Sequence, residues 1–333
     1  MDFMMSNNMN RIVFVTVIIL IISGCAHHIK LAEEKIQTIY LLESKDNDPV
    51  SQFAPVFLTH NHQEKYNRIG KPSAIIADNG KEKIYIDASI PVIYYMVRTF
   101  RTEKDMYTNY IYRIHFPRVP FSLIPYHISA GKNVGLITVI TVNSEKKPIL
   151  VTTVHTCGCY LAIVPTSNLP ADAFSDTWKE QKLKVYGERL PPRLEYVNVT
   201  EPRLLIHLRP GVHRVMDLDI IESQNIEADH RFNRIIALTA PMDNLTRIPV
   251  NGNFTGFYHS HGPMKGFVKG SVKVWESLFL SLISLDLYVG TDKIYGDPDI
   301  TGNTFYTSLK PWNRSASEMW DFKRFLEFWG WKL

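Results

Sequence analysis

The sequence is poor in cysteine, with three in 333 residues, and it has no long block of basic residues. So few cysteines exclude a disulfide scaffold, which a chain of this length does not need in order to bury a core. The formal net charge is only +4, from 37 basic and 33 acidic residues interspersed along the chain. This distribution, without any nucleic-acid-binding motif, argues against a nucleic-acid partner.

Several enzyme motifs are also missing. The sequence has no His-Glu-x-x-His zinc-protease motif, no Gly-x-Ser-x-Gly elbow, no P-loop and no Gly-x-Gly-x-x-Gly fingerprint. The hydrophobic content of 45%, with 12% aromatic residues, is typical of a folded globular body and argues against disorder. The composition therefore indicates a folded protein and leaves open whether it is an enzyme.

An uncharged apolar run covers residues 12–22 and follows Arg11. The run is shorter than the roughly 20 residues that a transmembrane helix needs. The core of a secretory signal peptide is about 7–15 residues long and follows a positive residue, and this run has both properties.

The run ends in Ile22, Ser23, Gly24 and Cys25, which resemble the lipobox of bacterial lipoproteins. This resemblance covers only the first 25 residues, and Ile22 stands where that family most often has Leu. It implies cleavage before Cys25 and a mature protein that carries acyl chains, such as palmitate, on this residue. Several acyl chains together anchor a protein stably in a membrane. Ala26 follows instead of the Asp that usually retains such proteins in the inner membrane, which favours the outer membrane.

Three parts of the chain are predicted. Residues 1–24 form the lipoprotein signal peptide, residues 25–52 the lipidated N-terminus and tether, and residues 53–333 a single body that faces the periplasm. The stretch 44–49 is polar and turn-rich, as linkers are.

The first half of the body has the pattern of β-strands. Tyr110, Tyr112, Ile114 and Phe116 alternate with polar residues, and a polar segment at 102–109 separates this strand from another at 91–101. A second hairpin is expected from 134–142 and 148–164, and a short strand at 204–208.

The end of the chain changes to helical spacing. Apolar residues recur every three or four positions in 274–288, and an aromatic helix is predicted to begin near Ser315, where Glu318 completes a capping box. That last helix either packs into the core or contacts the membrane. The predicted class is α+β, an antiparallel sheet-rich body followed by C-terminal helices.

One motif could carry chemistry. His155, Cys157 and Cys159 lie in the predicted strand 148–164. Because side chains alternate along a strand, positions two apart share a face, and these three are predicted to point the same way. Zinc accepts thiolate and imidazole ligands, usually four, and copper(I) prefers thiolates. A fourth ligand would come from another histidine, for which the candidates are His60, His62, His115 and His127.

Two other interpretations of the motif stay open. Cys157 and Cys159 could form a disulfide or redox pair in an oxidising periplasm, although alternate Cα atoms of a flat strand lie roughly 6.6 Å apart. Gly158 could relieve this geometry by bending the backbone. Alternatively, the three side chains simply pack in a sheet.

These features predict a membrane-anchored envelope lipoprotein that acts as a binding or interaction protein with an envelope partner. The alternative is a zinc- or copper-binding or thiol-redox protein that uses His155, Cys157 and Cys159.

Overall fold

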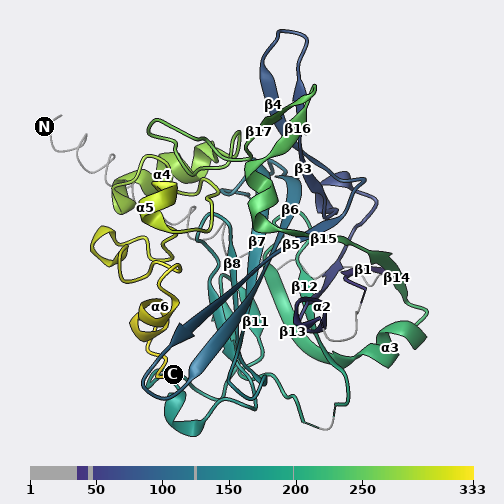
Figure 1. Cartoon of the computed structure of the whole chain (residues 1–333), viewed down its shortest axis with the longest axis vertical. Helices are drawn as coiled ribbons and strands as arrows, with labels where there is room; N and C mark the ends of the chain where they lie inside the picture. Colours follow the sequence, from purple (N-terminus) through teal and green to yellow (C-terminus); the bar gives the residue numbers. More distant parts are fainter. Residues whose placement is uncertain (1–35, 44–47, 124–125, 198) are drawn as a thin grey trace, which may run out of the picture.

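The computed structural model describes residues 36–43, 48–123, 126–197 and 199–333. The predicted signal peptide, the lipobox and Cys25 lie outside these residues. Strands dominate the described chain, and the longest helix and the last one lie in its C-terminal part (Figure 1). The predicted α+β class, a largely antiparallel sheet-rich body followed by helices, is confirmed.

The first of two large sheets has six strands. In order across the sheet they are β15 (Leu238–Pro241), β5 (Val92–Arg101), β6 (Met106–Val119), β7 (Gly131–Val142), β8 (Pro148–His155) and β9 (Ala162–Pro165). Neighbouring strands are antiparallel except β15 and β5, which are parallel. Both predicted hairpins are present, but the predicted strand 148–164 is two strands separated by a turn.

The second large sheet has five strands. In order they are β13 (Val215–Glu222), β12 (Pro202–Leu208), β2 (Val56–Thr59), β1 (Gln37–Leu41) and β14 (Phe232–Ile236). β12 contains the strand predicted at 204–208. β1 lies in the predicted tether, yet it pairs with β2 on one side and β14 on the other, and its Ile39 and Tyr40 are buried. Part of the predicted tether, from Gln37 to Leu41, therefore belongs to the five-stranded sheet.

Two main cores cover the two faces of the six-stranded sheet. Tyr112, Ile114 and Phe116 of β6 contribute to the core shared with the five-stranded sheet, as the predicted alternation requires. Ile111, on the opposite face of β6, belongs to a second core that includes side chains from the C-terminal part of the chain. Arg113 alternates with these residues and is fully buried, so it does not lie on a solvated face.

Smaller elements surround the two large sheets. Three two-stranded sheets pair β3 (Lys71–Ile76) with β4 (Glu82–Asp87), β10 (Leu183–Val185) with β11 (Glu188–Leu190), and β16 (Ile248–Val250) with β17 (Asn253–Thr255). The β3–β4 hairpin projects from the body at the top of Figure 1.

The helices are short apart from α4. The α-helices are α2 (Pro49–Gln52), α3 (Ser223–Ala228), α4 (Val274–Ser284), α5 (Pro298–Thr301) and α6 (Phe322–Phe328). Single 3-10 turns are η1 (Lys65–Asn67), η2 (Ala171–Ala173), η3 (Met242–Thr246) and η4 (Pro311–Asn313). α4 confirms the helix predicted from spacing, and it ends at Leu285, which adopts a left-handed conformation with φ of 51°.

The last helix begins later than predicted. The Glu318 carboxylate accepts hydrogen bonds from the backbone N–H groups of Trp320 and Asp321, at 2.7 and 3.1 Å, and does not close a capping box with Ser315. Asp321 instead caps α6, since its carboxylate accepts from the Arg324 N–H at 3.2 Å. The buried face of α6 makes this helix part of the core, as the first of the two interpretations proposed; its residues are Phe322, Phe325 and Leu326.

Candidate dithiol site

Cys157 and Cys159 lie in the turn that joins β8 to β9. β8 ends at His155, whose C=O accepts from the Gly158 N–H at 2.8 Å and whose N–H donates to the Cys159 C=O at 2.9 Å. Gly158 has a φ of +92°, a conformation that favours glycine. The prediction that three side chains share one strand face is therefore wrong, because the strand stops before the cysteines. A tight turn, not the alternation of a strand, brings the two sulfurs together.

Glu276 of α4 completes a group of three ligand atoms. The two cysteine Sγ atoms and a Glu276 carboxylate oxygen all lie within 4.8 Å of one another. The Cys159 thiol donates to Glu276 Oε1 at 3.2 Å, and Oε2 has no hydrogen-bond partner among the described residues. Cys157 and Glu276 are buried, whereas Cys159 is partly exposed. Cys159 is therefore the member of the group nearest to solvent.

A buried ion pair lies behind the thiols. Lys273 Nζ is 3.2 Å from Asp292 Oδ2, and both side chains are almost completely buried. Asp292 also accepts a hydrogen bond from the Thr156 hydroxyl, and the Lys293 N–H donates to the Thr156 C=O at 2.8 Å. These contacts tie the segment 291–293 to the turn that holds the cysteines.

The two thiols titrate as a coupled pair. When Cys157 is ionised, the Cys159 S–H can turn from Glu276 and donate to Cys157. This hydrogen bond, together with the charge of Lys273, lowers the pKa of Cys157 although burial opposes it. The same hydrogen bond, burial and the nearby Glu276 carboxylate raise the pKa of Cys159 well above its ordinary value. The pair therefore loses a first proton readily and a second one only with difficulty, which favours one thiolate stabilised by one thiol.

A second buried lysine borders the site. Lys293 Nζ lies 3.5 Å from the centroid of the Tyr306 ring, and burial lowers the pKa of Lys293 to about 8. The Tyr306 hydroxyl donates to Asp286 Oδ2 at 2.5 Å. The positive charges of Lys273 and Lys293 thus lower the cost of forming a thiolate at the site, and the carboxylates of Glu276 and Asp292 oppose it.

The predicted histidines do not join the group. His155 packs against the Tyr160 ring with centroids 4.6 Å apart, and burial with the adjacent Lys273 lowers its pKa well below the ordinary value. His62 Nε2 is 2.8 Å from the Tyr40 hydroxyl, and His127 Nδ1 is 3.0 Å from the Pro120 C=O.

The remaining two candidates are also elsewhere. His60 is buried at the end of β2, and His115 accepts from the Arg113 guanidinium at 3.1 Å. In the described part of the chain, the ligand group contains none of these histidines. The structure therefore brings none of the predicted histidines to the thiols, because the turns, loops and strand that carry them place their side chains elsewhere.

The charged residues of the site have no signal near the cysteines in the sequence. Lys273, Glu276 and Asp292 are more than a hundred residues from the cysteines, so no local pattern links them. One signal was nevertheless present: Glu276 is the only charged residue of the apolar helix 274–284. A lone carboxylate in such a helix is often buried with a partner.

Replacing Gly158 by alanine tests the turn. A Cβ at this position would lie 2.1 Å from the Tyr306 C=O, in addition to the strain of a positive φ. Gly80 also has a positive φ, of +74°, but nothing lies within 4 Å of its Cβ position. Gly80→Ala is expected to lower the free energy of unfolding by about 1–2 kcal/mol. Gly158→Ala is expected to lower it by about 1–3 kcal/mol more than Gly80→Ala does. Denaturant unfolding measures both, and equal losses would show that the close approach of Tyr306 is unimportant.

Comparisons with known protein families, with curated proteins and with solved structures find no match to the chain. Among the described residues, no helix is long and apolar enough to cross a membrane.

Proposed function

We propose that this chain is a lipid-anchored envelope protein whose body carries out thiol–disulfide exchange through Cys157 and Cys159. The observation that carries the exchange is the convergence of both sulfurs and the Glu276 carboxylate within 4.8 Å, beside the buried Lys273. Thiol reactivity requires a thiolate in an electropositive, partly accessible environment. Cys159 is partly exposed, and the lowered pKa of Cys157 provides the thiolate.

The exchange can be written with named atoms. The Cys159 thiol passes its proton to the Cys157 thiolate, and the resulting Cys159 thiolate attacks one sulfur of a disulfide in a partner protein. The first sulfur of the partner leaves as a thiolate and takes up the proton of Cys157, which leaves a mixed disulfide on Cys159 and restores the Cys157 thiolate. The Cys157 thiolate then attacks Cys159 Sγ, the second partner sulfur leaves, and a Cys157–Cys159 bond forms. Two electrons pass from this chain to the partner.

The experiment that tests the exchange is incubation with glutathione buffers followed by alkylation. Conversion of two thiols to one intramolecular bond supports the proposal. Two thiols that remain alkylatable in fully oxidised glutathione would contradict it.

A transition-metal site is the second candidate function. The same three ligand atoms favour it, since zinc accepts thiolate and carboxylate ligands and copper(I) prefers thiolates. Metal analysis of anaerobically purified protein separates the two functions. Zinc or copper at one ion per chain, lost in Cys157→Ser and Cys159→Ser, would favour the metal site, and metal-free protein with two titratable thiols would favour the exchange.

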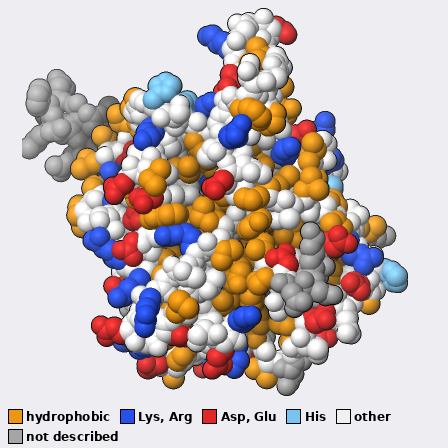
Figure 2. Space-filling model, in the orientation of Figure 1, with side chains coloured by type: hydrophobic (Ala, Val, Ile, Leu, Met, Phe, Trp, Pro, Cys, Tyr) orange, Lys and Arg blue, Asp and Glu red, His pale blue; other side chains and the backbone are white. Residues whose placement is uncertain are grey.

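Two observations support the lipid anchor. The first is the lipobox at 22–25, which lies outside the described residues. The second is the outer face of α4, where hydrophobic side chains reach the surface (Figure 2). Leu282 is 83% exposed and Ile283 65% exposed, whereas the only charged residue of the helix, Glu276, is buried. An apolar helix surface without charge is suited to the interface of a membrane to which the chain is already anchored.

The anchor is tested by Cys25→Ala. This variant is expected to lose all incorporation of radiolabelled palmitate and to accumulate as unprocessed precursor, because the thiol that accepts the lipid is gone. Cys159→Ala is the matched control and should be labelled normally. Labelled Cys25→Ala protein would refute the anchor and leave the dithiol proposal intact.

A further inference from the structure

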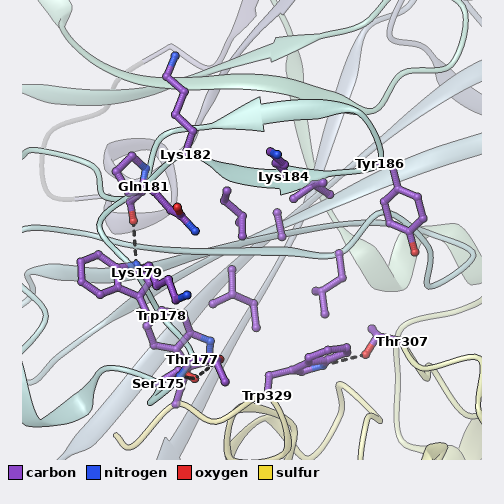
Figure 3. A pocket seen from close by; sticks show the side chains of 17 residues that line it. Ser175, Thr177, Trp178, Lys179, Gln181, Lys182, Lys184, Tyr186, Thr307 and Trp329 are labelled. Carbon is purple, nitrogen blue, oxygen red and sulfur yellow. Dashed lines mark hydrogen bonds between the residues drawn. The ribbon is translucent and has the colours of Figure 1, made fainter. Parts of the chain in front are cut away.

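A pocket of about 700 Å³, shown in Figure 3, is lined by segments that lie next to the turn holding the thiols. Residues 161–163 form part of its lining and begin two positions after Cys159. Thr307 also lines the pocket, and the Cα atom of Thr307 approaches the Cβ position of Gly158 to 4.0 Å. Two segments of the lining are therefore neighbours of the turn that holds the thiols, one along the chain and one in space. We call the pocket the lysine groove, after three of its lining residues, Lys179, Lys182 and Lys184.

The groove lies where two sheets end. β9 is the last strand of the six-stranded sheet, although the Leu194 N–H already donates to the C=O of its last residue, Pro165, at 2.9 Å. β10 pairs only with β11 in the described part of the chain. Residues of both β9 and β10 line the groove. The end strand of a sheet presents backbone N–H and C=O groups that a further extended strand can pair with.

The charged side chains that line the groove are all positive. The three lysines line the groove, and no aspartate or glutamate does. None of the three forms an ion pair within the described residues, whereas two nearby acidic residues are neutralised by other cations. Asp176 pairs with Lys332 at 2.5 Å, and Glu180 lies 3.9 Å from Arg193. The groove consequently has a positive potential that complements an acidic ligand.

Aromatic rings form the opposite side of the groove. Figure 3 shows the indoles of Trp178 and Trp329 across from the strand that carries Lys184 and Tyr186. Their N–H groups are already used: Trp178 Nε1 donates to the Pro192 C=O at 3.1 Å, and Trp329 Nε1 donates to Thr307 Oγ1 at 3.2 Å. What remains available to a ligand is the apolar surface of the rings, which suits aliphatic or aromatic side chains.

We infer that the lysine groove binds an acidic, extended polypeptide segment and presents it to Cys159. Strand edges supply backbone pairing, the lysines select acidic side chains, and the indoles accept the apolar side chains between them. A polypeptide fits better than an acidic saccharide because only a polypeptide can pair with the edge of β10 and with the part of β9 that Leu194 leaves open. The role of the groove rests on the proposed exchange, because the bound segment would carry the disulfide that Cys159 attacks. Binding of the segment does not itself require the thiols.

The test uses a fluorescein-labelled peptide of alternating glutamate and valine, titrated with the purified full-length protein in detergent and followed by fluorescence anisotropy. Saturable binding is expected, with a matched glutamine–valine peptide on the order of tenfold weaker and with affinity that falls as salt is added. Lys179→Glu combined with Lys184→Glu should weaken binding of the acidic peptide on the order of tenfold or more. Lys81→Glu combined with Lys83→Glu, the same charge change on the exposed β3–β4 hairpin, should leave it unchanged.

Three outcomes would overturn the inference. They are no binding of the acidic peptide, equal binding of the glutamine peptide, and binding of an acidic oligosaccharide such as oligogalacturonate without binding of the peptide. A Cys157→Ala/Cys159→Ala variant separates this inference from the proposed exchange. Unchanged peptide binding by that variant is expected, so failure of the exchange would not by itself remove the groove.

Discussion

Lys273→Met is expected to lower the free energy of unfolding by about 3–5 kcal/mol, because it leaves a buried carboxylate without its partner. Lys273 Nζ and Asp292 Oδ2 are 3.2 Å apart and almost completely shielded from water. Burial alone would lower the pKa of Lys273, but Asp292, Cys157 and Glu276 raise it well above 10.5. Since the folded pKa exceeds the unfolded one, this stabilisation is present at neutral pH and is lost only as the pH rises above about 10.5.

Two further variants give this prediction its controls. Lys269→Met breaks an ion pair with Glu82 at 2.8 Å that is partly exposed, and it should cost only about 0–1 kcal/mol. Lys273→Met combined with Asp292→Asn removes both charges and should be more stable than Lys273→Met alone. Denaturant unfolding at neutral pH measures all of them. If Lys273→Met were as stable as Lys269→Met, the buried pair would not support the site.

Cys159→Ala is expected to abolish intramolecular exchange and to raise the pKa of Cys157. The first effect follows because the partner sulfur is gone. The second follows because the S–H that donates to Cys157 is lost, so burial and the nearby carboxylates of Glu276 and Asp292 are opposed mainly by Lys273. Ultraviolet absorbance of the thiolate, followed against pH, measures the change without requiring a reagent to reach the buried sulfur.

Cys157→Ala is the matched variant. Its remaining thiol, Cys159, keeps the burial and the Glu276 carboxylate that raise its pKa. The wild-type protein should therefore begin to form thiolate at a lower pH than either single variant, because only the pair can share a proton. A single variant that titrates like the wild-type protein would show that the two sulfurs do not interact.

The fold could be predicted from the sequence wherever the pattern is local. Alternation in 110–116 identified β6, and three-to-four spacing after residue 274 identified α4, because each pattern reports the face that one element buries. The start of α6 was misplaced because both Ser315 and Asp321 can cap a helix. Only the packing of Phe322 and Phe325 against the sheet decides in favour of Asp321.

The cysteines of the candidate site could be predicted from the sequence, but their geometry and their charged neighbours could not. The two cysteines stood out because they are close in sequence, and the expected geometry failed because Gly158 allows a turn that ends the strand. Glu276 and Asp292 reach the thiols through the packing of the C-terminal segments on the six-stranded sheet. Such long-range contacts have no periodic signature in a single sequence.

The most direct test of the central claim is a redox titration of the purified mature protein. In that protein lipid is proposed to block Cys25, so only two thiols remain. Samples are equilibrated at a series of ratios of reduced to oxidised glutathione and then alkylated. Mass spectrometry of the intact protein counts the alkylated thiols at each ratio. Both alkylation sites are expected to disappear together in one two-electron transition, which should be absent from Cys157→Ala and Cys159→Ala. Two thiols alkylated at every ratio, or one glutathione adduct without an internal bond, would contradict it.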